Sequence, residues 1–238
     1  MRAAGQKADQ AGTATYSIVM KTTIPGQGPV TIKGKGVSSL RQPLGRSSMT
    51  MAGANQNISM EVLMTSSALY MKFPKEMAQE LGGKAWLKMS FADLQKASGL
   101  DLKALLEQSQ QSSPTEYLKA LVAAGDIKDL GTETVRGTAT THYSGTVTVQ
   151  ALTSAYQGEL REQVAGLLKQ MGTSPVKMDV WVAADGLPRR MRQVMTVGGN
   201  RSDMSMEFLR FGDTLDLTPP PATQTTDLAT LMGKERVG

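Results

Sequence analysis

Hydrophobic and polar residues alternate with a period of two over much of the chain, which is the pattern of strands with one buried face. In residues 13–23 (TATYSIVMKTT), Tyr16, Ile18 and Met20 alternate with Thr, Ser and Lys. The same alternation recurs at residues 30–37, around Met49 and Met51, and at residues 57–65, 68–74 and 84–90. The sequence therefore predicts a run of five or six strands in its first 90 residues.

The next part of the chain changes to helical signals. Ser90 and Asp93 have the spacing of a weak capping box before residues 91–99. Residues 101–110 are helical by propensity, and residues 113–125 carry a serine cap, a proline at the first helical position and a closing glycine. The apolar stripe of this last helix would be Tyr117, Leu118, Leu121 and Val122.

Strands return in the second half, interrupted by one more helix. Residues 126–137 and 138–150 are predicted strands, and residues 151–171 contain a predicted helix. Its apolar stripe at helical period is Leu160, Val164, Leu167, Leu168 and Met171.

Residues 175–195 predict a hairpin that turns at Asp185-Gly186, a strong signal for a two-residue turn. Its outward positions include Lys177 and Asp179. The chain turns again at residues 198–200, and residues 202–213 form a further strand with Met204, Met206 and Phe208 on one face.

The order of these elements indicates an α+β fold. Successive strands with short turns favour an antiparallel sheet, and the near absence of βαβ alternation argues against a doubly wound fold. We expect one curled antiparallel sheet, a half-barrel, wrapped over helices that close its concave side. The expected division is a tether at residues 1–12, a single domain at 13–217 and a proline-marked tail at 218–238, because proline cannot extend a central strand.

Composition narrows the function classes. The 238 residues are 40% hydrophobic but only 5% aromatic, with 16 Met, no Cys and a net charge of +5. The charge would suit nucleic acid or an anionic membrane, yet no Lys/Arg run exceeds a pair, which favours an ordinary basic surface without a nucleic-acid partner. No apolar stretch approaches the roughly 18 residues of a membrane span. No signal peptide is visible, although the small polar opening residues resemble a mature start after a removed export signal.

The sequence contains no complete motif for catalysis or cofactor binding. In residues 28–36 (GPVTIKGKG) the glycine spacing is one residue too long for a phosphate loop, and Gly36 replaces the required Ser or Thr. No GxSxG elbow occurs. His142, the single histidine, lies mid-strand, and the carboxylates are scattered, so neither a triad nor a metal cage is indicated. We expect no enzyme activity, no metal and no cofactor.

Methionine placement is the remaining signal. Most Met residues fall on the apolar faces of predicted strands, where Val, Ile and Phe are usual. Methionine is flexible and polarizable, whereas branched residues give a core its uniqueness. Two interpretations stay open: methionine fills a core under a shallow sheet, or it lines a cavity with a flexible apolar occupant such as acyl chains.

Four stretches together resemble a known family. They are residues 13–23, residues 135–149 (VRGTATTHYSGTVTV), residues 176–195 (VKMDVWVAADGLPRRMRQVM) and residues 211–228 (FGDTLDLTPPPATQTTDL). In this order they resemble the LppX/LprG group of actinobacterial cell-envelope lipoproteins, relatives of the LolA-type carriers. The likeness covers nearly the whole chain, and it implies a half-barrel with an apolar cavity between sheet and helices.

The resemblance also implies a function. It implies a non-enzymatic protein, exported and lipid-anchored at the extracytoplasmic face of the cell membrane, that carries or chaperones lipids or glycolipids with acyl chains. The anchoring lipobox Cys is absent from this chain. We expect a monomer. The expected cavity lining comprises Ile18, Met20, Ile32, Met49, Met51, Ile58, Met60, Val62, Met64, Leu69, Met71, Leu118, Leu121, Val122, Met178, Val180, Met191, Met195, Met204 and Met206.

Head-group contacts and alternative functions remain open at this point. Arg189, Arg190 and Arg192 are candidates for a head-group or membrane-facing role, or they are an ordinary solvated face beside a turn. The alternatives to a lipid carrier are a LolA-like sensor or partner-binding module without lipid transfer, and a hydrolase with an unrecognised site.

Overall fold

The computed structural model describes residue 7 and residues 10–24, 28–53, 57–79, 82–98, 127–153, 156–170, 172–173 and 175–235. Its strands are β1 (Thr13–Ile24), β2 (Gly28–Ser39), β3 (Gly45–Ala52), β4 (Asn57–Met64), β5 (Ala68–Lys72), β6 (Trp86–Ser90), β7 (Lys128–Val135), β8 (Thr138–Val147), β9 (Val176–Ala183), β10 (Pro188–Val197), β11 (Asn200–Phe211) and β12 (Thr225–Asp227). The helices are α2 (Lys75–Ala78), α3 (Phe91–Ser98), α6 (Val149–Thr153), α7 (Gly158–Gln170), α8 (Leu228–Glu235) and the 3₁₀ turn η1 (Ala222–Gln224).

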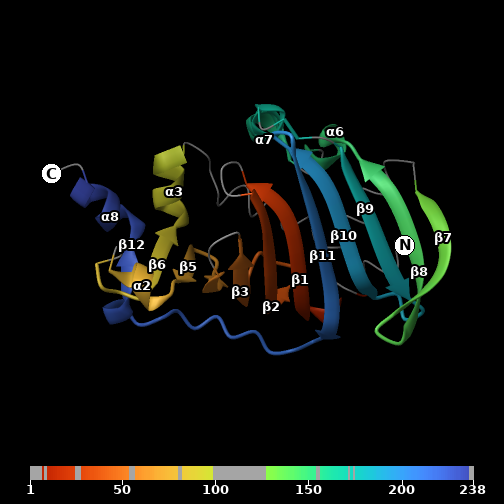
Figure 1. Ribbon diagram of the computed structural model, residues 1–238, viewed down its shortest axis with the longest axis horizontal. Coiled ribbons are helices and arrows are strands. Elements are labelled where there is room, and N and C mark those ends of the chain that lie inside the picture. Colours follow the sequence, from red (N-terminus) through yellow and green to blue (C-terminus); the bar gives the residue numbers. More distant parts are fainter. Residues whose placement is uncertain are drawn as a thin grey trace.

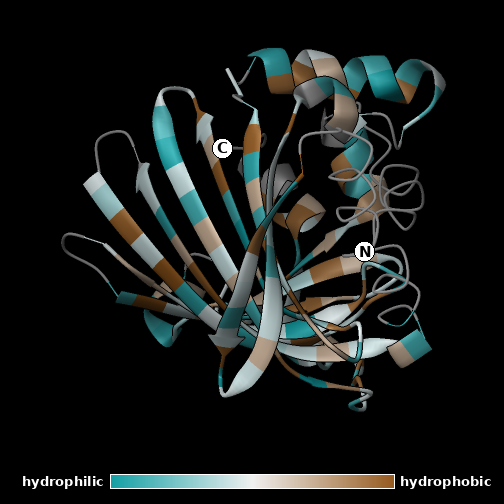
Figure 2. Ribbon diagram, turned by 90° about the vertical axis from the view of Figure 1, so that its right-hand side faces the viewer, coloured by the Kyte–Doolittle hydropathy of each residue, from teal (hydrophilic) through white to brown (hydrophobic). Residues whose placement is uncertain are grey.

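The twelve strands of the described residues belong to one sheet with the order β12-β6-β5-β4-β3-β2-β1-β11-β10-β9-β8-β7. It consists of two meanders, β1 to β6 and β7 to β11, joined where β1 pairs antiparallel with β11 (Figure 1). The sheet curls without closing on itself, and hydrophobic and hydrophilic residues alternate along its strands (Figure 2). The strands predicted from period two are all present.

The expectation of a purely antiparallel sheet is wrong at one edge. β12 pairs with β6 in the parallel direction, so the sheet is mixed. The chain reaches β12 by running from the end of β11 along the lower edge of the sheet, as Figure 1 shows. The sequence predicts a tail at residues 218–238, but these residues contribute β12 and α8. The sequence pattern does not reveal β12, because its backbone pairing with β6 needs no apolar side chains.

The connection that precedes β12 is packed rather than loose. Leu217 lies against a cluster formed by Leu63, Ala68, Tyr70 and Trp86. Asp216 accepts a hydrogen bond from the Arg46 guanidinium at 3.1 Å. The segment after β11 is therefore part of the folded unit.

Glycines in β2 allow neighbouring strands to approach closely. A Cβ atom at Gly36 would lie 2.5 Å from the carbonyl oxygen of Arg46 and 2.7 Å from the Cβ of Ser47. At Gly34 it would lie 3.0 Å from the carbonyl oxygen of Ser48. Glycine in a strand interior is typical of a tight bend or close backbone approach, and here it accompanies the curl of the sheet.

The main core lies over the β8–β11 part of the sheet. Its buried residues are Ala14, Leu40, Val147, Val176, Met178, Val180, Val182, Met191 and Phe208. Ala151 of α6 and Ala11 before β1 pack against it. The α6 helix therefore covers one end of the sheet face that carries Met178.

The described helices agree in part with the sequence. The Ser90 hydroxyl accepts a hydrogen bond from the Asp93 amide at 3.0 Å, which confirms Ser90 as the cap at the start of α3. The helix expected within residues 151–171 is two helices, α6 and α7, and none of the residues of α7 is buried. The helices expected at residues 101–110 and 113–125 lie outside the described residues, as do Leu118, Leu121 and Val122.

Two hairpin turns differ from the prediction. The two-residue turn lies between β10 and β11, where Gly198 and Gly199 have φ of 56° and 80°. Positive φ at both positions is what such a turn requires, and glycine supplies it without steric cost. The β9–β10 connection takes four residues, 184–187, with Gly186 at a φ of 82°.

Candidate functional site

The strand register places the expected lining residues in two rows. Residues directly opposite each other in an antiparallel pair point to the same face of the sheet. One row, the Met206 row, contains Met60, Met49, Gly34, Ile18, Met206, Met191 and Val180. The other, the Met204 row, contains Ile58, Met51, Ile32, Met20, Met204, Gln193 and Met178. We call the face that carries both rows the apolar face.

The apolar face extends onto β5 and β6. Val62 lies opposite Met71, which lies opposite Leu87, and Met64 lies opposite Leu69. Met195 also packs beside the main core at the far end of β10. The described part of the expected lining thus shares one face of one sheet, as period two predicts.

Burial divides this face into two parts. Met178 and Val180 are fully buried and Met191 is 7% exposed, so these three residues belong to the protein's own core. The expected lining residues on β1 to β5, among them Met20, Met49 and Met60, are only half-buried. The half-buried part therefore retains apolar surface that a ligand or another element can cover.

The opposite face of β7 to β11 carries a polar network around His142. Glu133 Oε1 lies 2.8 Å from His142 Nδ1, and Asp179 Oδ1 lies 3.2 Å from His142 Nε2. The Trp181 ring stacks on the imidazole with centroids 4.2 Å apart and donates its indole N–H to Glu133 at 2.8 Å. The hydrogen bond from Trp181, followed by that from His142, lowers the pKa of Glu133. The single histidine is thus fully engaged in a structural network.

The three arginines considered for a head group are all ion-paired. Arg189 pairs with Asp185 at 2.5 Å, Arg190 with Glu207 at 2.7 Å and Arg192 with Asp203 at 2.6 Å. Arg192 lowers the pKa of Asp203 through its hydrogen bonds.

Glu207 belongs to the same set of ion pairs. Burial raises its pKa, but hydrogen bonds from Arg136 and Arg190 outweigh burial and leave the pKa below its ordinary value. These arginines therefore stabilise the outer face of β9 to β11.

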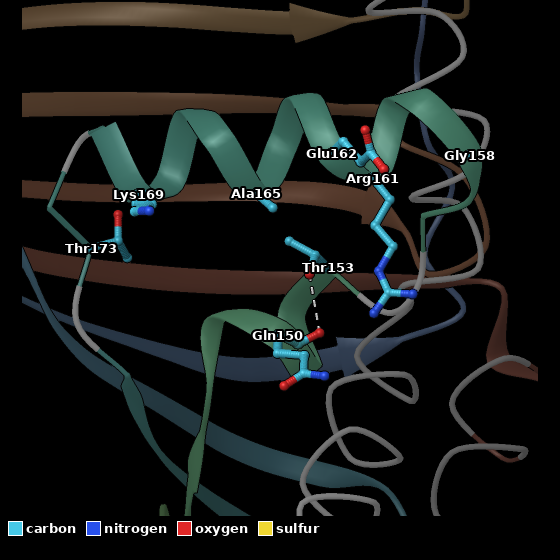
Figure 3. Close-up of a pocket in the computed structure, with 8 residues that line it drawn as sticks. All are labelled: Gln150, Thr153, Gly158, Arg161, Glu162, Ala165, Lys169 and Thr173. Carbon is cyan, nitrogen blue, oxygen red and sulfur yellow. Dashed lines mark hydrogen bonds between the residues drawn. The ribbon is translucent and has the colours of Figure 1, made fainter.

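An open pocket of about 780 Å³ lies between α6, α7 and the residues that follow α7 (Figure 3). Its described lining is Gln150, Thr153, Gly158, Arg161, Glu162, Ala165, Lys169 and Thr173. We call it the polar pocket. Sequence reasoning missed it, because the interruption between α6 and α7 that creates it falls inside the segment expected as one helix.

The described residues contain neither a candidate metal site nor a helix that could span a membrane. Within those ranges no group of three or more His, Cys, Asp or Glu is placed to hold a metal ion. Over the same part of the chain, no helix combines the length and apolar character needed to cross a bilayer.

Two curated proteins of Streptomyces are similar in sequence. One, from Streptomyces griseus, is described as an uncharacterized 31.2 kDa protein of the rplA–rplJ intergenic region and is 33% identical over 168 residues, 68% of this chain. The other, from Streptomyces coelicolor, bears the name "putative lipoprotein" and is 25% identical over 178 residues, 74% of this chain. The matched part spans 54% of each relative, so the chain corresponds to about half of their length. No protein-family model matches the chain.

Solved structures in which the chain follows a similar course include LprF and the lipoprotein LppX, both from mycobacteria. LprF from Mycobacterium bovis has a TM-score of 0.49 and 14% identity over 93% of this chain and 97% of its own. LppX from Mycobacterium tuberculosis has a TM-score of 0.44 and 11% identity over 91% and 98%. The course of the chain is thus similar to that of LprF and LppX. The fold assignment rests on the strand order and register of this chain.

Proposed function

We propose that the protein binds lipids or glycolipids non-enzymatically and shelters their acyl chains on the apolar face, as a carrier or chaperone in the cell envelope. The observation that carries the proposal is the apolar face itself. Its two rows cross β1 to β4 with half-buried methionine and isoleucine side chains, which is unusual for a closed core. The likeness to a protein named as a lipoprotein supports an exported, envelope-associated location.

Energetics favour such a face for acyl chains. Each methylene kept from water contributes about 0.8 kcal/mol, so a sixteen-carbon chain faces a cost of about 13 kcal/mol on leaving a bilayer for water. An equally apolar protein surface cancels most of that cost and leaves transfer nearly balanced. Methionine suits the role because its unbranched side chain repacks around chains of different length.

The occupant also has to be released, which fits a surface rather than a sealed core. Met49 and Met60 lie opposite each other on β3 and β4 and are half-buried, whereas Met178 is inaccessible. We therefore assign the acyl-chain contacts to the β1–β5 part of the apolar face and treat Met178, Val180 and Met191 as the supporting core.

The experiment is organic extraction of the purified full chain from its natural envelope, followed by mass spectrometry. We expect acyl-chain lipid in near-stoichiometric amount. Met60→Glu should abolish it, because a carboxylate on the apolar face is poorly compensated once a hydrocarbon chain covers it. The matched control is Ser59→Glu, which adds the same charge one residue away on the opposite, exposed face.

Lipid retained by Met60→Glu at the wild-type level would refute the assignment to this face. Absence of any lipid from the wild type, together with no uptake from vesicles, would favour the sensor or partner-binding alternative.

A further inference from the structure

The polar pocket contains two cationic side chains that pair with no carboxylate among the described residues. Arg161 and Lys169 both line it from α7, and within the described ranges neither forms an ion pair. They are eight residues apart, or about 12 Å along the helix axis. This contrasts with Arg189, whose charge is already matched by Asp185. Figure 3 shows the Arg161 side chain extending from α7 toward α6, with Lys169 and Thr173 at the other end of the helix.

A second observation points to a ligand in the same pocket. The Thr173 hydroxyl oxygen is buried and, among the side-chain atoms the structure describes, stands without a hydrogen-bond partner. Buried polar groups in folded proteins are otherwise almost always satisfied by protein or water. Thr173 lies beside Lys169, so a ligand oxygen placed there would accept a hydrogen bond from the hydroxyl and meet the ammonium group (Figure 3).

The pocket adjoins the end of the sheet nearest the Met204 row. Ala151 of α6 packs against the core cluster that contains Met178, the last member of that row. Gly172, which precedes Thr173, lies against the β10–β11 turn, where a Cβ on it would be 3.7 Å from the Gly198 nitrogen. A molecule whose chain follows the apolar face from β1–β5 toward this end of the sheet would bring its polar end toward the pocket.

We propose that the polar pocket binds an anionic head group, a phosphate or a carboxylate, of the acyl-chain lipid. This inference rests on the proposed lipid-binding function and assigns its polar subsite. Lys169 would donate a charge-assisted hydrogen bond to the anion and Thr173 would donate a second, whereas Arg161, at the other end of the helix, would contact another polar part of the same head group. Glu162 is the one carboxylate in the described lining, and it weakens the preference for anions.

Two lipids with identical acyl chains test the assignment: dioleoyl phosphatidic acid and dioleoylglycerol, each offered in neutral phosphatidylcholine vesicles. We expect the wild type to take up the phosphatidic acid about tenfold more strongly, the size of effect expected of one charge-assisted contact. The variant Arg161→Gln/Lys169→Gln should bind both lipids equally, and Glu162→Gln should enlarge the preference. The control Lys33→Gln/Lys35→Gln removes the same charge from exposed positions on β2 and should keep the preference. Thermal melts of all variants verify that they fold.

The outcomes separate the two proposals. Equal uptake of both lipids by the wild type, or a preference that survives Arg161→Gln/Lys169→Gln, overturns the head-group site and leaves lipid binding intact. Uptake of neither lipid overturns lipid binding and the head-group site together. Inorganic phosphate is the third probe. If it binds the wild type but not Arg161→Gln/Lys169→Gln, while phosphatidic acid has no advantage over dioleoylglycerol, the pocket serves a free anion and the head-group assignment is wrong.

Discussion

Methionine has two different roles in this sheet, and truncating one member of each group separates them. Met178 is fully buried beside Val147, Val176 and Val180, so Met178→Ala leaves a cavity in the main core. Such substitutions cost about 2–5 kcal/mol. In a chain of this length each 1 kcal/mol lowers Tm by about 2–4 °C, so we expect a drop of at least about 4 °C. Met60→Ala, on the half-buried part of the apolar face, should cost less than about 1 kcal/mol, because its side chain has fewer contacts to lose.

The assay is urea unfolding of lipid-free protein, followed by tryptophan fluorescence and far-ultraviolet circular dichroism. Trp86 in β6 and Trp181 in β9 are both buried, so the change in their emission reports unfolding of both halves of the sheet. Delipidated protein is essential, since a bound ligand raises apparent stability by mass action. The reasoning is refuted if Met60→Ala destabilises as strongly as Met178→Ala. The β1–β5 methionines would then be core residues, and the apolar face would hold no site.

Three further predictions concern the frame around this face. The pKa of Glu207 is lowered in the folded state, so its contribution to stability is complete above its unfolded pKa of 4.5 and is lost as pH falls through the folded pKa. Glu207→Gln should therefore have a lower Tm than the wild type at pH 6, and the difference in Tm should narrow towards pH 3. A difference in Tm that stays constant with pH would contradict this. Gly36→Ala should lower the free energy of unfolding by about 1–3 kcal/mol, because its Cβ would lie 2.5 Å from the Arg46 carbonyl oxygen. The control is Gly166→Ala in α7, where a Cβ meets nothing within 4 Å; in thermal melts it should be neutral or stabilising by up to about 1 kcal/mol. Deletion of residues 222–238 removes β12 and exposes the edge of β6, so we expect a lower Tm and concentration-dependent association in light scattering, and an unchanged monomer would show that β12 is dispensable.

Period two in the sequence predicts which residues share a face, because the side-chain direction alternates in every strand regardless of its neighbours. The placement of Ile18, Met49, Met60 and Met206 in one row follows from this rule alone. Burial depends instead on what lies above each strand. Met178 and Met49 have the same pattern in the sequence, yet among the described residues α6 and the main core cover the region of Met178 and not that of Met49. Sequence patterns could not therefore divide the expected lining into core and surface.

The features that the sequence did not predict, β12 and the polar pocket, depend on contacts between segments that are distant in the sequence. Residues 225–227 (TTD) are too short and too polar to show a strand period, and β12 forms because the chain is carried back to β6. No proline marks the break between α6 and α7, so the sequence gives no local signal for it. The apolar stripe of Leu160, Val164 and Leu168 lies within α7 alone and does not show where α6 ends. Since the polar pocket lies beside that interruption, Arg161 and Thr173 carried no signal as site residues. Asp179 shows the reverse error: its outward position suggested solvent exposure, yet it is 4% exposed beside His142.

The most direct test of the central claim is photo-cross-linking with a fatty acid that carries a diazirine near its methyl end, followed by peptide mapping. Because the proposed acyl-chain contacts are on β1 to β5, we expect adducts on peptides that contain Met20, Met49 or Met60, with competition by unlabelled fatty acid. Adducts confined to the outer face, for example to the exposed Lys33 and Lys35 of β2, or adducts that unlabelled fatty acid does not reduce, would contradict the account.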